Sequence, residues 1–167
     1  AQAEYSLRRA KLALGLRTNM HIGGTAVGTG INTHPKFAAK VCQVLTKRIG
    51  VEFVEAVNPP EAQAAKDSFV GAHGELRTIA VSLSKIANDI RHVGSGPRCI
   101  MPGKVNPVIC ESVMQVVCRV LGNDATVTSA ALGGIGSIFE LNVAMPVMID
   151  AFLESVTLLA NSSNVFV

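Results

Sequence analysis

Residues 61–93 constrain the fold more than any other part of the chain, because their apolar residues recur at the period of long packed helices. Steps of three and four alternate through Ala62, Ala65, Phe69, Ala72, Leu76, Ile79, Leu83, Ile86, Ile90 and Val93. A period of about 3.5 residues is typical of helices in coiled-coil-like bundles. One helix over this segment would be about 50 Å long and would need packing partners along its whole length. The sequence therefore predicts an all-α fold, a bundle of long helices.

Proline and glycine residues divide the rest of the chain into further predicted helices. Residues 1–16 form one, and a second begins at Pro35 and ends at Gly50. A helix that begins near residue 107 is expected to be interrupted at Gly122 and to resume as far as residue 131. The last helix is expected from about residue 138, with a bend at Pro146.

Composition indicates that much of the surface is buried against a partner. Hydrophobic residues make up 49% of the chain and charged residues 16%, whereas soluble proteins carry about 25% charged residues. We therefore expect self-association. The net charge of +3 is too small and dispersed to indicate nucleic-acid binding. The sequence lacks an uncharged apolar run of about 18 residues, so a membrane-spanning helix is not predicted. Its four cysteines form no C-x-x-C pair, which favours reduced thiols in a cytosol-like compartment.

Residues 101–107, Met-Pro-Gly-Lys-Val-Asn-Pro, combine a cation and an amide at a predicted helix start. Asn106 is expected at the N-cap and Pro107 at the first helical position. Lys104 and Asn106 would then stand where free N–H groups and the helix dipole favour an anion such as a carboxylate. From spacing alone, a capped turn with a solvated lysine is the alternative interpretation.

The glycine-rich residues 23–30 do not match a known nucleotide-binding motif. A Walker A loop ends in Gly-Lys-Ser/Thr, but Gly30 is followed by Ile31 and Asn32. A dinucleotide fingerprint would need a third glycine and a preceding strand. A nucleotide-binding module is thus a weak hypothesis, and we expect a connection between helices.

Four stretches together resemble a class II (iron-independent) fumarate hydratase of the fumarase/aspartase superfamily. Residues 101–107 resemble the second half of the superfamily signature G-S-S-x-M-P-x-K-x-N-P. Three more stretches agree: Gly-Gly-Thr-Ala-Val-Gly-Thr-Gly at 23–30, Lys-Ile-Ala-Asn-Asp-Ile-Arg at 85–91 and Phe-Glu-Leu-Asn-Val at 139–143. The resemblance covers nearly the whole chain. Aspartase, the nearest sister, usually has Ala at the position of Gly103 and lacks the Phe-Glu before Leu-Asn-Val.

The resemblance implies reversible hydration of fumarate to L-malate by anti addition and elimination through an aci-carboxylate intermediate. Lys104 and Asn106 match the family's binding pair, and Val105 would contribute main-chain contact. Glu111 matches the glutamate that pairs with the catalytic histidine, although a first-turn glutamate can also simply satisfy the helix dipole. The matching histidine belongs to an upstream Thr-His stretch that these residues do not contain, so none of the four histidines receives its role. The resemblance implies no metal or organic cofactor.

The resemblance also implies that residues 1–167 are part of a central helical domain, without the family's N- and C-terminal domains. Relatives carry a loop with the serine thought to be the catalytic base between the stretches that here end at Cys99 and begin at Ile100. We therefore predict that Cys99 and Ile100 are not consecutive in the natural protein. Family members form homotetramers in which long helices share a core and three subunits build each active site. The implied location is the cytoplasm, or the mitochondrial matrix in a eukaryote.

Two rival classes of function stay open at this point. Aspartate ammonia-lyase, argininosuccinate lyase and adenylosuccinate lyase would share the pair Lys104 and Asn106. A non-catalytic, truncated helical assembly protein would lack the serine loop.

Overall fold

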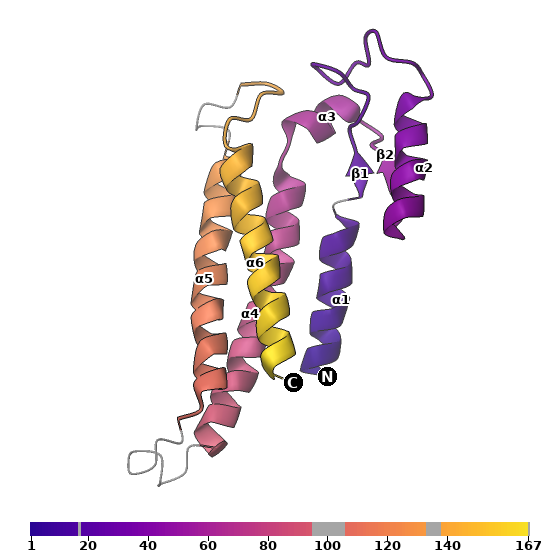
Figure 1. The fold of residues 1–167 in the computed structure, drawn as a ribbon. Helices are drawn as coiled ribbons and strands as arrows, with labels where there is room; N and C mark the ends of the chain where they lie inside the picture. The colour runs from indigo at the N-terminus through magenta and orange to yellow at the C-terminus, as the bar shows by residue number, and fades with distance from the viewer. Residues whose placement is uncertain (17, 95–105, 133–137, 167) are drawn as a thin grey trace.

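The computed structural model describes residues 1–16, 18–94, 106–132 and 138–166, and it is predominantly helical (Figure 1). The elements in chain order are α1 (Gln2–Gly15), β1 (Asn19–Met20), α2 (Phe37–Ile49), β2 (Val54–Glu55), α3 (Pro59–Ala64), α4 (Asp67–Gly94), α5 (Val108–Ala131) and α6 (Met145–Phe166). Helices α4, α5 and α6 form an antiparallel bundle, and α1 packs along α4. The all-α bundle prediction is confirmed. None of the helices in the described ranges is long and apolar enough to cross a membrane.

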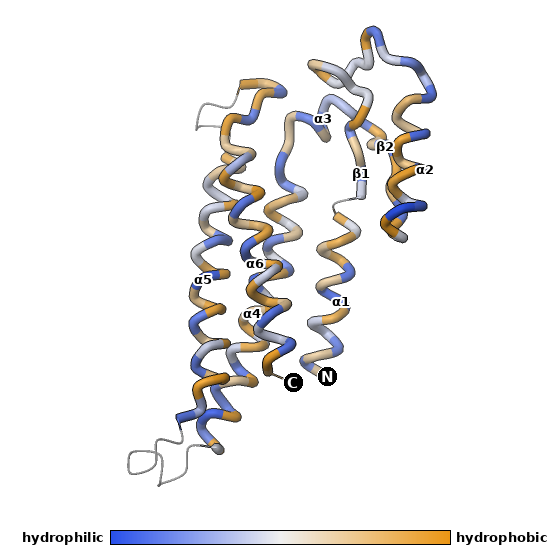
Figure 2. The backbone as a smooth tube through the Cα atoms, in the orientation of Figure 1, coloured by the Kyte–Doolittle hydropathy of each residue, from blue (hydrophilic) through white to orange (hydrophobic). Residues whose placement is uncertain are grey.

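Small side chains on α4 allow the bundle helices to approach closely. Ala72, Ala80 and Ala87 are completely buried and lie on one face of α4. Valines of α5, including Val117 and Val120, pack in the same core. Hydropathy along the backbone agrees, because apolar positions recur along each bundle helix (Figure 2). The predicted period thus corresponds to a real packing face.

The prediction of one helix over residues 61–93 is wrong at its beginning. The structure has two helices there, α3 and α4, separated at Ala65 and Lys66. Ala65 adopts an extended conformation with ψ 142° and ends α3. Asn58 caps the start of α3, since its side chain accepts a hydrogen bond from the Glu61 backbone N–H at 3.3 Å. The apolar period continues across the break, which explains why the sequence pattern did not reveal it.

The predicted interruption of α5 at Gly122 is also wrong, because α5 is continuous from Val108 to Ala131. Asn123 and Asp124 face the bundle interior and are 4% and 8% exposed. Partners on neighbouring helices satisfy both side chains. These contacts stabilise helical backbone at a place where the local sequence favours a turn.

The last helix starts later than predicted. Helix α6 begins at Met145, and Pro146 therefore lies in its first turn. A proline there loses no backbone hydrogen bond, because first-turn N–H groups have no partner within the helix. The structure therefore gives no reason for Pro146 to bend α6, although the sequence had suggested a bend there. The preceding segment contains a bridge between Ile138 and Leu141.

Helix α2 and the two short strands form a separate region beside the bundle (Figure 1). The predicted end of α2 is confirmed, since Gly50 is its C-cap and has φ 75°. The strands β1 and β2 pair in parallel, Asn19 with Val54 and Met20 with Glu55. These two-residue strands were not predicted.

The glycine-rich loop between β1 and α2 is attached to α3. Gln63 donates through Nε2 to the backbone oxygens of Thr25 and Ala26, at 3.1 and 2.6 Å. A Cβ atom on Gly28, whose φ is 80°, would lie 2.4 Å from the Pro60 backbone. Glycine is therefore required at this position for close contact as well as for backbone conformation.

Candidate functional site

The start of α5 carries the predicted residues that the structure describes. Pro107 is the N-cap, one residue later than expected, so the assignment of Asn106 to the N-cap is wrong. The reason is that the Pro107 carbonyl accepts the first helical hydrogen bond, from the Glu111 N–H at 3.1 Å. Asn106 lies just outside the helix, is exposed, and accepts from the Val108 N–H at 2.8 Å through its backbone oxygen. Lys104 and Val105 lie outside the described residues.

Glu111 lies in the first turn of α5 and is half-buried. Its neighbour Cys110 packs in a cluster with Ala87 near the end of α4, and Phe166 near the end of α6 packs against the same cluster. The structure therefore brings Asn106 and Glu111 to one end of the bundle, where α4 and α6 end and α5 begins. A negative charge at this helix N-terminus is favourable.

A groove of about 230 Å³ lies between the first turns of α5 and the last turns of α6. Its lining residues are Ile109, Ser112, Val113, Val116, Leu158, Asn161, Ser162 and Val165. This lining contains no charged side chain. A dicarboxylate needs cationic or multiple N–H partners, so these described residues alone do not form a site for one.

A second polar constellation, which sequence analysis missed, lies in the middle of the bundle. His73 on α4 is completely buried, and its Nδ1 lies 2.9 Å from Asp124 Oδ1 on α5. Its Nε2 lies 2.9 Å from Ser155 Oγ on α6. Arg77 donates to Asp124 Oδ2 at 2.7 Å. The complete burial of His73 favours a structural role over a catalytic one.

Asn123 and Glu154 extend this constellation toward the surface. Asn123 Nδ2 donates to Glu154 Oε2 at 2.8 Å and to Ser155 Oγ at 3.1 Å. Arg119 Nε donates to both Glu154 oxygens at 3.0 Å. We call the seven residues His73, Arg77, Arg119, Asn123, Asp124, Glu154 and Ser155 the polar layer.

Both ring nitrogens of His73 have hydrogen-bonding partners in the polar layer, Nδ1 at Asp124 and Nε2 at Ser155. The Ser155 hydroxyl donates to the Ala151 backbone oxygen at 2.9 Å, and its oxygen accepts a hydrogen bond from the Asn123 amide. The arrangement resembles a nucleophile, base and carboxylate in sequence. Ser155 is nevertheless completely buried, and a buried hydroxyl has no access to substrate. The polar layer therefore holds helices together.

The Glu154 carboxylate at the edge of the polar layer is the clearest perturbed acid in the described chain. Its pKa lies below the ordinary value of 4.5, mainly because Arg119 and then Asn123 donate hydrogen bonds to the ionised form. The same contact with Glu154 raises the pKa of Arg119.

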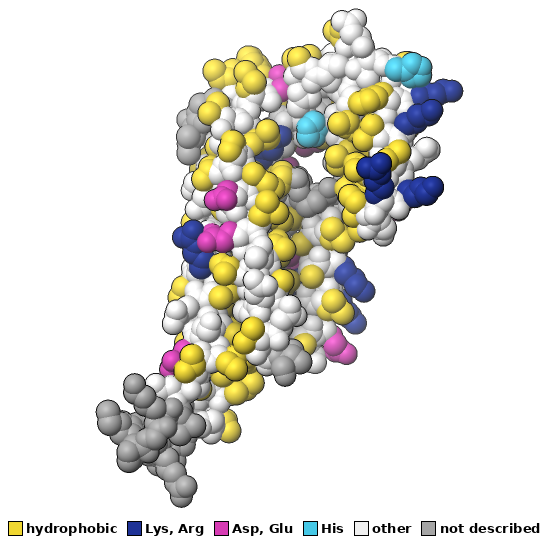
Figure 3. Space-filling model, in the orientation of Figure 1, with side chains coloured by type: hydrophobic (Ala, Val, Ile, Leu, Met, Phe, Trp, Pro, Cys, Tyr) yellow, Lys and Arg dark blue, Asp and Glu magenta, His cyan; other side chains and the backbone are white. Residues whose placement is uncertain are grey.

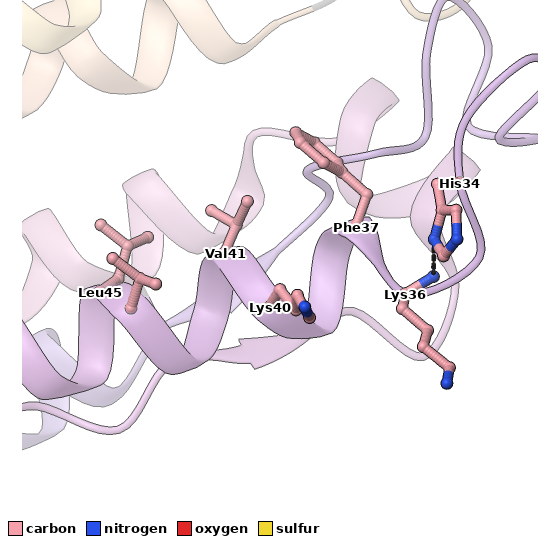
Figure 4. Close-up of a pocket in the computed structure, with 7 residues that line it drawn as sticks. His34, Lys36, Phe37, Lys40, Val41 and Leu45 are labelled. Atoms are coloured by element: carbon pink, nitrogen blue, oxygen red, sulfur yellow. Dashed lines mark hydrogen bonds between the residues drawn. The ribbon is translucent and has the colours of Figure 1, made fainter.

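The region of α2 offers an apolar groove of about 550 Å³ (Figure 4). Phe37, Val41 and Leu45 line it on one side of the helix, with Lys36 and Lys40 beside them. His34 accepts a hydrogen bond from the Lys36 N–H through Nδ1 at 3.1 Å, just before α2 begins.

Cys42 on the other side of α2 is buried, and burial followed by the charge of Glu55 raises the pKa of its thiol. A thiol with a raised pKa is a poor nucleophile and metal ligand. Among the described residues, no three His, Cys, Asp or Glu side chains are placed to hold a metal ion.

Comparisons with known proteins agree with the family that the sequence motifs indicate. A protein family described as Lyase matches residues 1–122, more than half of the sequence. The chain belongs to this lyase family. Among its relatives are class II fumarate hydratases from Mycobacterium tuberculosis, at 48% identity, and Neisseria meningitidis, at 44% identity, each over 181 aligned residues. Each alignment covers 99% of this lyase chain and 38% of the relative.

Solved structures show the same architecture. A class II fumarase from Schistosoma mansoni matches this lyase chain with a TM-score of 0.90 and 31% identity, covering 99% of this chain and 40% of that one. A fumarate lyase:delta crystallin from Brucella melitensis matches with a TM-score of 0.84 and 40% identity, covering 94% and 37%. The chain thus spans about two-fifths of the length of these relatives. Membership of the fumarase/aspartase superfamily, predicted from the motifs, is confirmed.

Proposed function

We propose that this chain is part of a class II fumarate hydratase, which interconverts fumarate and L-malate. The observation that carries the proposal is the 48% identity to the Mycobacterium tuberculosis class II fumarate hydratase across 99% of the chain. The fold supports it, because a class II fumarase superposes with a TM-score of 0.90.

The start of α5 supplies chemistry suited to this reaction. Removal of a proton beside a carboxylate of malate transfers negative charge onto that carboxylate, and fixed donors lower the barrier by stabilising the charge where it develops. In the proposed site Lys104 supplies a full positive charge, Asn106 a directional N–H donor and Val105 a main-chain contact. Glu111, one turn further along, orients a histidine and favours its protonated form. Hydration itself requires no redox or group-carrying cofactor.

The remaining parts of the site come from segments outside this chain. The alignments with relatives span 181 residues and this chain has 167, so at least 14 aligned positions (181 minus 167) have no counterpart here. This difference supports the proposal that a serine-bearing loop separates Cys99 from Ile100 in the natural protein. Both residues lie outside the described ranges. Residues 1–167 would then be one portion of a central helical domain.

Exposed apolar surface on the bundle supports the proposed homotetramer with composite active sites. Ile149, Leu153 and Val156 on α6 are 40–56% exposed. They line, with side chains of α1 and α4, a groove of about 510 Å³. Figure 3 shows hydrophobic side chains along this face. Contiguous exposed apolar surface of this kind typically marks an interface. The proposed location is the cytoplasm, or the mitochondrial matrix in a eukaryote.

Turnover of the full-length protein tests the proposal. We expect fumarate formation from malate, followed by absorbance, and no ammonia release from aspartate. Lys104→Met should lower kcat by at least about 100-fold with the oligomer intact, because a donor to the transition state is lost. Lys85→Met, which alters an exposed lysine on α4, is the matched control and should leave kcat within about twofold.

Ammonia release from aspartate without malate turnover would instead identify an aspartate ammonia-lyase. Absence of both activities in a protein that carries the serine loop would contradict the proposal. Near-normal kcat in the Lys104 variant would remove that residue from the site.

A further inference from the structure

The polar layer is the place where directional contacts join all three bundle helices at one height. His73 of α4 contacts α5 through Asp124 and α6 through Ser155, each at 2.9 Å. Asn123 of α5 completes the triangle by donating to Ser155 at 3.1 Å. His73, Asn123 and Ser155 are 0%, 4% and 0% exposed. Three helices are thus connected pairwise by buried hydrogen bonds.

Apolar packing above and below the polar layer does not fix the helices along their axes as strictly. The faces that meet combine small side chains such as Ala80 and Ala87 with larger ones such as Leu76 and Met148. Contacts between apolar side chains are not directional, so they tolerate a small axial shift better than hydrogen bonds do. A hydrogen bond weakens steeply when its atoms move by a few tenths of an ångström or its angle falls. Buried polar contacts are the best-attested means of specifying register in helical bundles.

Helix α5 transmits its axial position to the proposed active site. Glu111 lies 13 residues before Asp124 on the same continuous helix, about 20 Å along its axis. The intervening hydrogen-bonded turns make the helix stiff in this direction, so a displacement at Asp124 reappears at Glu111 and Asn106. Displacement of a reacting group by 1 Å can lower a rate by about 100-fold.

We infer that the polar layer sets the axial register of α5 against α4 and α6, and that His73, Asp124 and Ser155 thereby act as positioning residues for the active site at the start of α5. This inference rests on the proposed function for its catalytic consequence. The register itself is a property of the fold and can be tested separately. The groups that face His73 are Asp124 of α5 and, from α6, Ser155 and Phe152. Arg77, which like His73 belongs to α4, donates a hydrogen bond to the Asp124 carboxylate.

Ser155→Ala in the full-length protein tests the inference. The substitution leaves His73 Nε2 and the Asn123 amide without their common partner but removes only one oxygen atom. The matched control is Val127→Ala, since Val127 is completely buried on α5 one turn beyond Asp124 and lies outside the polar layer. Both substitutions should lower the Tm. The kinetic constants kcat and KM are therefore measured at a temperature well below the lower of the two Tm values.

We expect kcat/KM for malate to fall at least about tenfold in Ser155→Ala, mainly through kcat, and to stay within about twofold in Val127→Ala. Equal losses in the two variants, or unchanged kcat/KM in both, would overturn the inference. If Ser155→Ala does not fold, Asn123→Ala replaces it with the same expectation.

Crystal structures of the same variants separate this inference from the proposed function. We expect α5 to be displaced along its axis relative to α4 in Ser155→Ala and to superpose on the wild type in Val127→Ala. An undisplaced α5 in Ser155→Ala would contradict the register inference even if malate is turned over. Displacement in an enzyme that does not act on malate would support the register and contradict the proposed function.

Discussion

The bundle of α4, α5 and α6 and the region of α2 solve the problem of burial in different ways. The bundle buries large aliphatic side chains together with a hydrogen-bonded polar layer. Helix α2 buries only Ala38 and Cys42, and Phe37 and Val44 on it are 45% and 50% exposed. Lysine and arginine side chains lie along its outer side (Figure 3). Free energy of unfolding is therefore concentrated in the bundle, whereas α2 is held by few contacts.

The largest expected loss in the free energy of unfolding comes from replacing Asp124, at the centre of the polar layer. Asp124→Ala breaks the buried contact with His73, and breaking a buried pair on one side costs about 3–5 kcal/mol. The contact with Arg77 adds little, because the Arg77 side chain is 52% exposed to solvent. The exposed Asp150 on α6 is the control, and Asp150→Ala should change the free energy of unfolding by less than about 0.5 kcal/mol. Urea denaturation measures both. Similar losses in the free energy of unfolding for the two variants would show that the polar layer does not stabilise the bundle.

A smaller contrast is expected between apolar truncations in the two regions. Met148 on α6 is 1% exposed, so Met148→Ala should cost about 2–5 kcal/mol through lost burial and a cavity. Val44→Ala on α2 removes a side chain that is 50% exposed, and it should cost under about 1 kcal/mol. Hydrogen exchange of the α2 amides should be faster than that of α5 in the wild type. A costly Val44→Ala would show that α2 has a partner that covers it in the assembled protein.

The smallest effect is expected at the edge of the polar layer, and it depends on pH. The pKa of Glu154 is lowered below 4.5 in the fold, so its contribution is present above that pH and is lost as the pH falls through the lowered value. Glu154→Gln should therefore lower the urea midpoint slightly at pH 7 and by less at pH 3. Equal shifts at both values would show that packing, not ionisation, determines the effect.

Much of the bundle could be predicted from the sequence because one apolar period continues through it. The same continuity concealed the break at Ala65, where the pattern persists although the backbone becomes extended. At Gly122 the opposite error arose, because Asn123 and Asp124 looked like residues of a turn. Their partners come from helices more than 30 residues away in the chain, as for Asn123 and Glu154, and no local pattern reports such pairing.

The positions of two candidate site residues relative to the start of α5 were predicted to within one residue, and their roles stay a prediction. Asn106 and Glu111 lie at the start of α5 as expected, although Pro107 takes the capping position. The motif identified these residues through family resemblance, while spacing alone left a solvated turn open. The burial of His73 could not be predicted from the sequence. The apolar period of α4 does not show whether a polar residue beside the apolar positions is buried or exposed.

Contacts of Gln63 and Gly28 attach the glycine-rich loop to α3. Two hydrogen bonds from Gln63 hold the loop carbonyls, and the Gly28 backbone rests on Pro60 without space for a side chain. Movement of residues 23–30 away from α3 would therefore break both hydrogen bonds and open the close contact of Gly28 with Pro60.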